Sequence, residues 1–385
     1  MSFFDVLQQY PAADLVARVD RVEDADIERA LSRTRPSIDD YLCLLSPRIS
    51  DVQLETMAGL AHRVTMQRFG RTIRLYAPLY LSNHCSNGCL YCGFSADNRG
   101  LVRKTLNDRE IVREAEHLRR LGFRDILLLT GEAPKFAGLD YLEHAVRLVA
   151  PMFSSLSIEV FPLTRAGYRR LVDAGVDGLT LYQETYDQGL YPEFHPYGPK
   201  KDFRFRLEGP ERGGEAGIRM LGIGALLGLG DFVTDAFYTG LHARYLMHRF
   251  WRSQVSVSFP RLRPAEGGFR PRSVVDDRQL AQLICALRLL LPDAGLVLST
   301  RESARLRDNL LPLGITRMSA GSRTAPGAYE GHRDQGEQFS VSDLRSPDEV
   351  RKVVAGNGYD VVWKDWDGAF TAGRHENRHG GTGIP

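Results

Sequence analysis

Several features are scarce or missing in this chain, and each absence excludes a class of protein. The 385 residues include only five cysteines, which excludes a small scaffold held together by disulfides. Lys and Arg total 50 against 48 Asp and Glu, a formal net charge of +2, so no general basic field for nucleic acid is expected. The longest apolar stretch, near 222–230, is rich in glycine and far shorter than the ~20 residues that span a bilayer. We therefore expect neither nucleic acid nor a membrane as a partner.

Signals for export are also missing. The first residues, MSFFDV, contain no basic stretch followed by an apolar run, so we expect a cytoplasmic protein. In a reducing compartment, clustered cysteines more often bind metal or take part in catalysis than form disulfides. Charged residues make up 25% and hydrophobic residues 43% of the chain. These proportions are typical of a folded globular protein and exclude disorder over most of the length.

Three regions differ in their patterns. Residues 1–70 are charged and carry apolar side chains at helical intervals, which predicts an N-terminal helical extension, and Ser37 is placed to cap one of its helices. Residues 71–325 alternate short apolar runs with amphipathic stretches. Residues 326–385 are expected to form a C-terminal extension with a helix near 347–356. Its end is rich in Gly and His, which predicts a mobile tail.

The alternation over residues 71–325 predicts the fold class. Strand–helix–strand repeats form parallel sheets with right-handed crossovers, and eight such repeats close into a barrel. We therefore expect an α/β protein with a (β/α)8 TIM-type barrel, the alternative being an open or six-stranded barrel. The helix expected at 108–121 is typical, because Asn107 can cap its start and Gly122 can end it. The expected strands are 73–81, 125–130, 156–160, 178–182, 220–226, 254–258, 296–299 and 315–319.

A cysteine cluster follows the first expected strand, at the end of the barrel where TIM-type enzymes place their chemistry. Cys85, Cys89 and Cys92 are spaced CxxxCxxC on a loop that contains the turn formers Asn87 and Gly88. Three thiolates this close together can hold one metal centre. The spacing differs from the paired CxxC modules of structural zinc. A structural zinc site and unliganded buried cysteines are the alternatives.

This cysteine motif, with the aromatic Tyr91 before its last cysteine, resembles that of the radical S-adenosylmethionine (SAM) enzymes. The resemblance implies a [4Fe–4S] cluster held by Cys85, Cys89 and Cys92, with one iron left open for SAM. It also implies that Tyr91 belongs to the cofactor site. Cys285 stands alone in an apolar run, where we expect it to be a core residue.

Polar residues follow the next expected strands at the same end of the barrel. In the radical SAM superfamily a GGE motif accepts the SAM amino group; here Thr130 replaces the first glycine, and Glu132 is the expected acceptor. Glu159 and Gln183 can contact ribose hydroxyls. Arg206 is a candidate for the SAM carboxylate or the surroundings of the cluster. The alternatives are a helix-initiating glutamate, structural roles for the strand-end residues, and a solvated run of basic side chains that includes Arg206.

A second pair of candidates ends the last two strands. Arg301 follows the seventh expected strand, and Ser319 ends the eighth. An arginine in this position can clamp a substrate carboxylate through two parallel hydrogen bonds, and a serine hydroxyl can share the carboxylate. Arg301 and Ser319 are therefore the candidate catalytic residues. The alternative for Arg301 is a salt bridge to Glu302 or to a neighbouring loop.

Further segments sharpen the resemblance. The segments are PLYLSN (78–83), YCGF (91–94), YQETY (182–186), VSFPRLRP (257–264), STRES (299–303) and VWKDWD (362–367). Together they resemble the 2-iminoacetate synthases, the tyrosine lyases of thiamine biosynthesis, over nearly the whole chain. Related families are the tyrosine lyase of hydrogenase cofactor maturation, which carries a second cluster on C-terminal cysteines, and the tryptophan lyase of antibiotic biosynthesis. No cysteine follows Cys285 here, which argues against the first of these.

The resemblance implies a reaction and its partners. It implies cleavage of the Cα–Cβ bond of L-tyrosine to 2-iminoacetate (dehydroglycine) and 4-cresol, with 5′-deoxyadenosine and methionine formed from SAM. The cofactors would be the [4Fe–4S] cluster and SAM. The protein partners would be thiazole synthase and an electron donor of the flavodoxin or ferredoxin type. The alternatives are a related aromatic amino acid lyase, a different radical SAM reaction, and a non-catalytic iron–sulfur or zinc protein.

Overall fold

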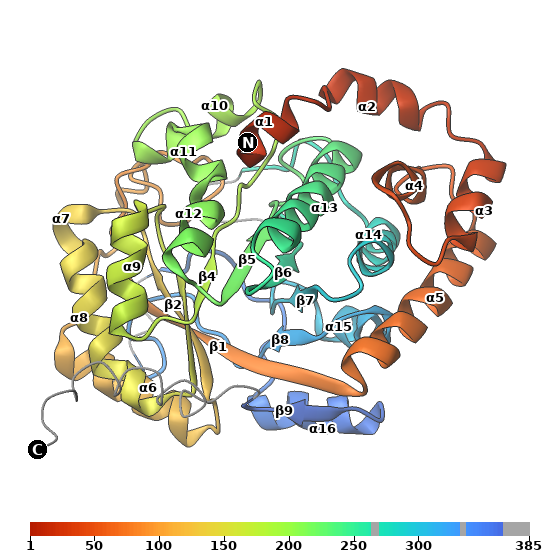
Figure 1. Ribbon diagram of the computed structural model, residues 1–385. Coiled ribbons are helices and arrows are strands. Elements are labelled where there is room, and N and C mark those ends of the chain that lie inside the picture. Colours follow the sequence, from red (N-terminus) through yellow and green to blue (C-terminus); the bar gives the residue numbers. More distant parts are fainter. Residues whose placement is uncertain (263–268, 332–335, 365–385) are drawn as a thin grey trace, which may run out of the picture.

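The computed structural model describes residues 1–262, 269–331 and 336–364, and its centre is a closed barrel of parallel strands (Figure 1). Each strand pairs with the next along the chain, and β1 closes the ring by pairing with both β2 and β8. The expected (β/α)8 TIM-type barrel is therefore confirmed. Its strands are β1 (Thr72–Ser82), β2 (Asp125–Thr130), β3 (Ser155–Glu159), β4 (Gly178–Thr180), β5 (Met220–Gly224), β6 (Gln254–Ser258), β7 (Gly295–Leu298) and β8 (Arg317–Ser319).

Helices connect successive strands across the outside of the barrel. In α6 the side chain of Asn107 accepts the N–H of Glu110 at 3.1 Å, and the Glu110 carboxylate accepts the N–H of Asn107 at 2.9 Å. Gly122 follows this helix with φ +97°, so both expected helix signals are confirmed. The crossover helices are α6 (Asp108–Arg120), α7 (Pro134–Ala137), α8 (Leu139–Val149), α9 (Arg165–Ala174), α10 (Tyr191–Phe194), α11 (Phe203–Leu207), α12 (Gly209–Ala216), α13 (Phe232–Arg249), α14 (Asp277–Leu290) and α15 (Ala304–Leu310).

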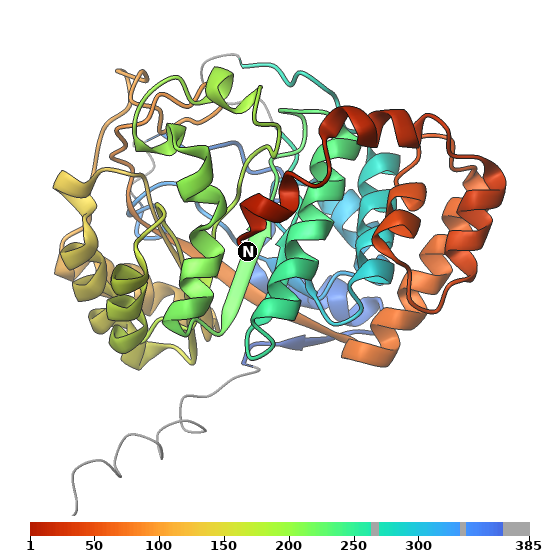
Figure 2. The ribbon, with the colours of Figure 1, turned by 45° about the horizontal axis from the view of Figure 1, so that its top comes forward.

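Five helices precede the barrel and wrap one of its sides. Figure 2 shows them, coloured red to orange, against α13 and α14. Ser37 caps the fourth of them by accepting the N–H of Asp40 at 3.1 Å, as expected. Cys285, on the inner face of α14, is fully buried in the core, which confirms its expected position. The helices are α1 (Phe3–Leu7), α2 (Ala12–Val19), α3 (Asp24–Ser32), α4 (Ile38–Leu44) and α5 (Asp51–Phe69).

The segment after β8 adds the helix expected near 347–356 and a ninth strand that the sequence did not predict. After α16 (Pro347–Gly356), β9 (Asp360–Val362) pairs in parallel with the first residues of β1. Trp363 then packs edge-on against Phe123, with ring centroids 5.3 Å apart, so this tryptophan covers the barrel wall. Trp366 and the tail expected to be mobile lie outside the described residues.

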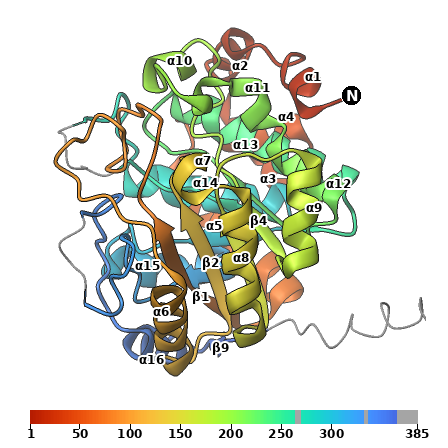
Figure 3. The same cartoon turned by 90° about the vertical axis from the view of Figure 1, so that its left-hand side faces the viewer.

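The two ends of the barrel differ in what covers them. Figure 3 shows the loop after β1, in orange, and α10 at one end, with β9 and α16 at the other. The carboxyl ends of the strands point toward the first of these ends, so the site expected from the sequence lies there. Within the described residues, no helix combines the length and the apolar character needed to cross a membrane.

Candidate active site

Two adjoining cavities open at the carboxyl ends of the barrel strands. The cysteine cavity is lined by all three cysteines of the CxxxCxxC motif and by charged side chains from β3, the loop after β4 and α11. The arginine cavity lies toward β6, β7 and β8 and contains Arg301 and Ser319. Tyr80, Leu129 and Glu159 line both cavities. A molecule in one cavity therefore lies next to a molecule in the other.

Close backbone contacts hold the cysteine loop in place. A Cβ atom at Gly88 would lie 2.2 Å from the ring of Tyr197, and one at Gly131 would lie 2.3 Å from the carbonyl oxygen of His84. Both positions therefore require glycine. The side-chain oxygen of Asn87 accepts the N–H of Lys200 at 2.9 Å. The loop is thus fixed against the segments that follow β2 and β4.

Glu132 lies in the cysteine cavity, where the sequence predicted a ligand for the SAM amino group. Its carboxylate accepts a hydrogen bond from Asn87 Nδ2 at 2.7 Å. Its backbone carbonyl accepts two hydrogen bonds from Ser86, from the N–H at 2.9 Å and from the hydroxyl at 2.7 Å. Glu132 is therefore held beside Cys85, with a second carboxylate oxygen left for a ligand.

A largely buried ionic group, formed by Glu184, Lys200 and Arg206, also lines the cysteine cavity. Glu184 accepts from Lys200 Nζ at 2.6 Å and from Arg206 at 3.3 Å. Burial raises the pKa of Glu184, but these two cations outweigh burial and hold the pKa below its ordinary value. Arg206 also donates to the carbonyl of Tyr182 at 2.6 Å. The interpretation of Lys200 and Arg206 as part of a solvated charge run is wrong, because both side chains are buried against this carboxylate.

Glu184 also has an unusual backbone. Its φ of +74° is the one positive φ at a non-glycine residue among those described. A residue with a Cβ in this conformation costs about 1–3 kcal/mol, and such strain persists where the surroundings hold it. Strand alternation places Tyr182 and Glu184 on the cavity side. That alternation was the available signal for Glu184, whereas nothing in the local sequence pointed to Lys200.

Gln183 and Tyr91 lie outside the lining of both cavities. The amide of buried Gln183 donates to the carbonyl of Phe203 at 3.3 Å, away from the cysteines. The hydroxyl of Tyr91 contacts His195 Nε2 at 2.8 Å, and His195 Nδ1 is 2.8 Å from the carbonyl of Tyr191. Since Nδ1 donates to that carbonyl, Nε2 accepts from Tyr91. Tyr91 therefore supports the wall behind Cys89, with which it shares an apolar cluster.

Glu159 stands where the two cavities meet. Burial, followed by the negative charge of Glu184, raises the pKa of Glu159 to about 7. The positive charge of Arg301 acts in the opposite direction. A carboxyl group with this pKa can hold or release a proton near neutral pH. The sequence predicted a contact of Glu159 with ribose, which stays a prediction; in the structure Glu159 lines both the cysteine cavity and the arginine cavity.

Arg301 extends its guanidinium into the arginine cavity. Its Cζ lies 3.4 Å from the ring centroid of Phe339, and among the described residues its guanidinium donates no hydrogen bond and forms no ion pair. The expected alternative, a salt bridge from Arg301 to Glu302, is wrong, because Glu302 pairs with Arg261 Nε at 3.0 Å. Burial lowers the pKa of Arg301, yet arginine keeps its charge. An unpaired cation in a cavity favours an anionic ligand.

Ser319 lines the same cavity at the end of β8. Its hydroxyl oxygen accepts the N–H of Thr300 at 3.0 Å, which ties the end of β8 to the residue before Arg301. The hydroxyl proton stays available as a donor. The structure therefore brings Arg301 and Ser319 into one cavity, as the sequence predicted for a carboxylate clamp.

The cysteine cavity fits an iron–sulfur cluster. Three thiols from one loop face it, and thiolate is the protein ligand of such clusters. Lys200 and Arg206 supply positive charge at the same wall, which offsets the negative charge of the ligands. Within the described residues no group of three or more His, Cys, Asp or Glu side chains is arranged for a single metal ion. All five cysteines are free thiols.

Comparisons with known proteins agree with this arrangement. Residues 79–235 match the radical SAM superfamily, and residues 258–360 match the biotin and thiamin synthesis associated domain. The chain is 46% identical over 367 residues to the 2-iminoacetate synthases of Salmonella typhimurium and of Escherichia coli, covering 95% of this chain and 97% of each relative. Among solved structures, the FeFe-hydrogenase maturase HydG from Carboxydothermus hydrogenoformans is similar with a TM-score of 0.86 and 34% identity. That match covers 93% of this chain and 84% of HydG.

Proposed function

The chain belongs to the 2-iminoacetate synthase family of the radical SAM superfamily, and from that premise we propose that it cleaves the Cα–Cβ bond of L-tyrosine. The products would be 2-iminoacetate and 4-cresol, and SAM would yield 5′-deoxyadenosine and methionine. The 2-iminoacetate would serve as a precursor of the thiazole of thiamine. The chain spans nearly the full length of its curated relatives, so this activity is proposed for the protein as a whole.

The unpaired guanidinium of Arg301 is the observation that supports this proposal most directly. It lies in a cavity lined by Tyr76, Tyr80, Tyr182 and Phe339, which suits an aromatic amino acid with a free carboxylate. Because Tyr80 and Glu159 also line the cysteine cavity, such a substrate would lie next to the cofactor site. Two directed hydrogen bonds to the carboxylate would fix the orientation of the amino acid.

The cofactors are assigned to the cysteine cavity. Cys85, Cys89 and Cys92 would hold the [4Fe–4S] cluster, and Glu132 and Arg206 would bind the amino and carboxylate groups of SAM. When bound, the reduced cluster and SAM supply the 5′-deoxyadenosyl radical that the reaction requires. The protein itself must position the tyrosine amine and exclude water, and orientation of this kind is worth about 7–11 kcal/mol.

Glu159 is suited to proton handling at the junction of the cavities. An amino acid held by Arg301 would place its amine toward the shared wall formed by Tyr80, Leu129 and Glu159. A carboxyl group with a pKa of about 7 can accept a proton from an ammonium group and return it near neutral pH. We assign Glu159 this role in addition to the ribose contact expected from the sequence.

The partners and the location follow from the same family. We propose thiazole synthase as the recipient of the product and a flavodoxin- or ferredoxin-type protein as the electron donor. Free thiols persist in a reducing compartment, and all five cysteines are free in this chain. We therefore propose that the protein acts in the cytoplasm.

Product analysis after anaerobic incubation with SAM, reductant and tyrosine tests the proposed function. We expect 4-cresol and 5′-deoxyadenosine in comparable amounts from protein that carries a full cluster. A 3-methylindole-type product from tryptophan, with no 4-cresol from tyrosine, would instead identify a tryptophan lyase. Iron and sulfide without any 5′-deoxyadenosine would identify a non-catalytic iron–sulfur protein.

A further inference from the structure

A short segment far along the chain crosses the rim of the arginine cavity. We call residues 338–345 the C-terminal strap. The N–H of Gln338 donates to the carbonyl of Thr324 at 3.1 Å, and the carbonyl of Gln338 accepts the N–H of Gly93 at 3.0 Å, next to Cys92. The N–H groups of Ser342 and Asp343 both donate to the carbonyl of Thr300, at 3.0 and 3.1 Å. The strap therefore joins the cysteine loop to the residue before Arg301.

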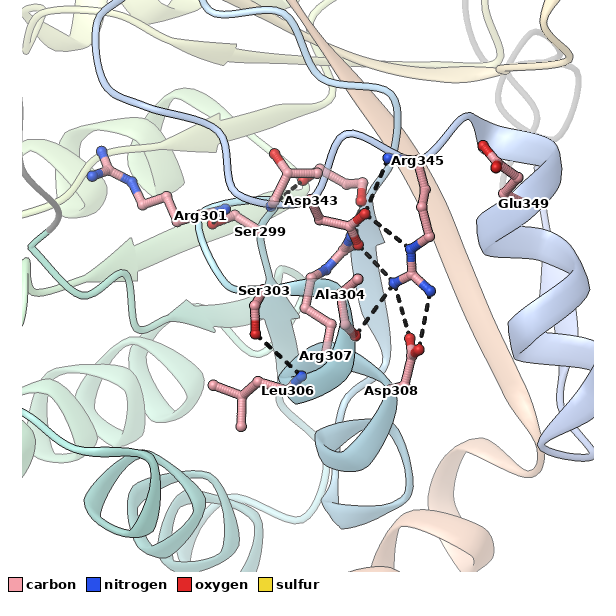
Figure 4. A network of polar contacts seen from close by, with 12 residues as sticks. Ser299, Arg301, Ser303, Ala304, Leu306, Arg307, Asp308, Asp343, Arg345 and Glu349 are labelled. Atoms are coloured by element: carbon pink, nitrogen blue, oxygen red, sulfur yellow. Dashed lines mark hydrogen bonds and ion pairs between the residues drawn. The ribbon is translucent and has the colours of Figure 1, made fainter.

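An ionic network with a buried Arg307–Asp343 pair anchors the C-terminal half of the strap. Asp343 contacts Arg307 of α15, and both side chains are 0% exposed. Arg345 donates to the same carboxylate at 2.7 Å and to Asp308 at 2.9 Å. Burial raises the pKa of Asp343, but the hydrogen bond from Arg345 and the charge of Arg307 outweigh burial and lower it. The positive charges of the two arginines thus balance the negative charges of the two carboxylates. Figure 4 shows this group between α15 and the strap.

The network also reaches the substrate clamp. Besides Asp343, Arg307 donates a hydrogen bond to the backbone carbonyl of Ser319. The hydroxyl of Ser319 in turn accepts the N–H of Thr300. One fully buried guanidinium therefore fixes the strap and the end of β8 together. Figure 4 shows Arg301 apart from this network, with its guanidinium pointing away from Arg307 and Arg345.

The strap contributes one direct contact to the clamp. The ring of Phe339 covers a face of the Arg301 guanidinium, with the Cζ atom 3.4 Å from the ring centroid. Phe339 also lines the arginine cavity. A ring stacked on a guanidinium leaves the N–H groups at its edge free, which are the groups that hold a carboxylate through two hydrogen bonds. The ring also restricts the long side chain to one orientation, so less entropy is lost when a ligand binds.

We infer that the C-terminal strap completes the substrate site, with Phe339 as the positioning residue that holds Arg301 ready for the α-carboxylate of the amino acid and the Arg307–Asp343 pair as the anchor of the strap. This inference rests on the proposed tyrosine cleavage and names the part of the chain that sets the orientation of the substrate. With its carboxylate at Arg301, the substrate would direct its amine toward the wall that the two cavities share, formed by Tyr80, Leu129 and Glu159. A loosened Arg301 should therefore impair coupling between SAM cleavage and product formation as well as affinity.

The test compares Phe339→Leu with Phe339→Tyr in protein that carries a full cluster. Leucine keeps the apolar character and removes the ring, so the KM for tyrosine should rise about ten-fold, equal to roughly 1.4 kcal/mol. Equilibrium binding of tyrosine should weaken by a similar factor. The ratio of 5′-deoxyadenosine to 4-cresol should also rise. Tyrosine at position 339 keeps a stacking ring and should restore all three values toward wild type.

Two further variants separate positioning from general damage. Leu344, also in the strap, is 70% exposed, and Leu344→Ala should match wild type in KM, binding and product ratio. Asp343→Asn should lower the melting temperature, because it leaves the fully buried Arg307 without its carboxylate. It should also raise the KM, as Phe339→Leu does. If Asp343→Asn does not fold, the comparison of Phe339→Leu with Phe339→Tyr still tests the role of the strap.

The possible outcomes separate a failure of the strap's proposed role from a failure of the proposed function. Wild-type protein that makes 4-cresol, together with a Phe339→Leu variant of unchanged KM, tyrosine binding and product ratio, would overturn the role of the strap alone. Equal losses in Phe339→Leu and Phe339→Tyr would also overturn it, because the ring would then not be the feature that matters. Wild-type protein with a full cluster that neither binds tyrosine nor makes 4-cresol would overturn the proposed function and the strap's role in it.

Discussion

The cysteine cavity and the arginine cavity share a wall but are built in different ways. The three thiols of the first come from one loop that directly follows β1. The second combines the ends of β6, β7 and β8 with Phe339, which lies in the C-terminal strap. The proposed cofactor ligands are therefore local in the sequence, whereas the proposed substrate site depends on contacts between distant segments. Spacing reveals a local motif and the barrel pattern places Arg301 and Ser319 at strand ends, but neither places Phe339 of the strap beside Arg301.

Their electrostatics differ as well. In the cysteine cavity the Glu184 carboxylate is paired with two cations, Lys200 and Arg206, before any cofactor binds. In the arginine cavity the guanidinium of Arg301 is stacked on Phe339 and has no ionic partner among the residues that the structure describes. A paired charge holds a wall in place, whereas an unpaired one is available to a ligand.

The largest effect should come from removing one of the three thiols that line the cysteine cavity. Changing Cys85, Cys89 or Cys92 to Ala should abolish the iron content, the brown chromophore and SAM cleavage, because a cluster needs all three protein ligands. Iron analysis and absorption spectra measure the loss. Cys285→Ala is the control and should keep the cluster, since this cysteine is buried in α14. A Cys285→Ala protein that folds without iron would contradict the assignment.

Arg301→Lys should impair the arginine cavity while leaving the cysteine cavity intact. Lysine keeps the charge but cannot reproduce two parallel hydrogen bonds to a carboxylate, so 4-cresol formation should fall by about 10²-fold. SAM cleavage without tyrosine should change little, because the cysteine cavity is untouched. Chromatography of 4-cresol and 5′-deoxyadenosine from one reaction measures both. Equal losses of the two products would show that the cavities are not separable in this way.

Glu132→Gln should have a smaller effect than Arg301→Lys, and on the opposite cavity: it should weaken SAM binding and leave tyrosine binding nearly unchanged. The variant keeps the size of the side chain and its contact to Asn87, but removes the charge proposed to bind the SAM amino group. SAM binding should weaken by about ten-fold, the value of one charge-assisted hydrogen bond. Tyrosine binding should stay within about two-fold of wild type. Equilibrium titration with each ligand gives both affinities, and an unchanged SAM affinity would remove Glu132 from the cofactor site.

The smallest expected effect is on the stability of the fold and comes from the buried residue Asp235. Asp235 is buried and accepts the N–H of Tyr186 at 2.7 Å and the hydroxyl of Thr185 at 3.0 Å. Burial raises its pKa from 3.8 to about 7. Between about pH 4 and pH 7 the unfolded chain releases this proton while the folded chain keeps it, so the free energy of unfolding falls as the pH rises through that window.

Asp235→Asn removes this carboxyl group and its pH dependence. The melting temperature of the variant relative to wild type should therefore be higher at pH 8 than at pH 5, by a few degrees. Thermal melts at the two pH values measure the difference. The same difference at both pH values would mean that Asp235 is ionised in the fold across the whole range.

Most of the fold and half of the site were accessible from the sequence. The eight expected strands lie within a few residues of β1–β8, because buried parallel strands are short apolar runs that alternate with amphipathic helices. The ninth strand was not expected, since it is three residues long and is stabilised by pairing with β1. Lys200 and Glu184 were not selected as site residues. Lys200 lies in a three-residue 3-10 helix, Pro199–Lys201, where no pattern marks a site, whereas for Glu184 the signal of strand alternation was present and was not used.

The sequence by itself determined the elements whose causes are local. Helix capping by Asn107, the CxxxCxxC loop and the positions of Arg301 and Ser319 at strand ends all follow from neighbouring residues and from the period of the apolar pattern. The tertiary structure alone decided which charges are compensated and which stay free. Glu302 pairs with Arg261 rather than with its neighbour Arg301, and Phe339 reaches Arg301 from the strap. Such pairings depend on the distances between segments that lie far apart in the chain. Closure of the barrel sets these distances, and they cannot be read from composition, spacing or periodicity.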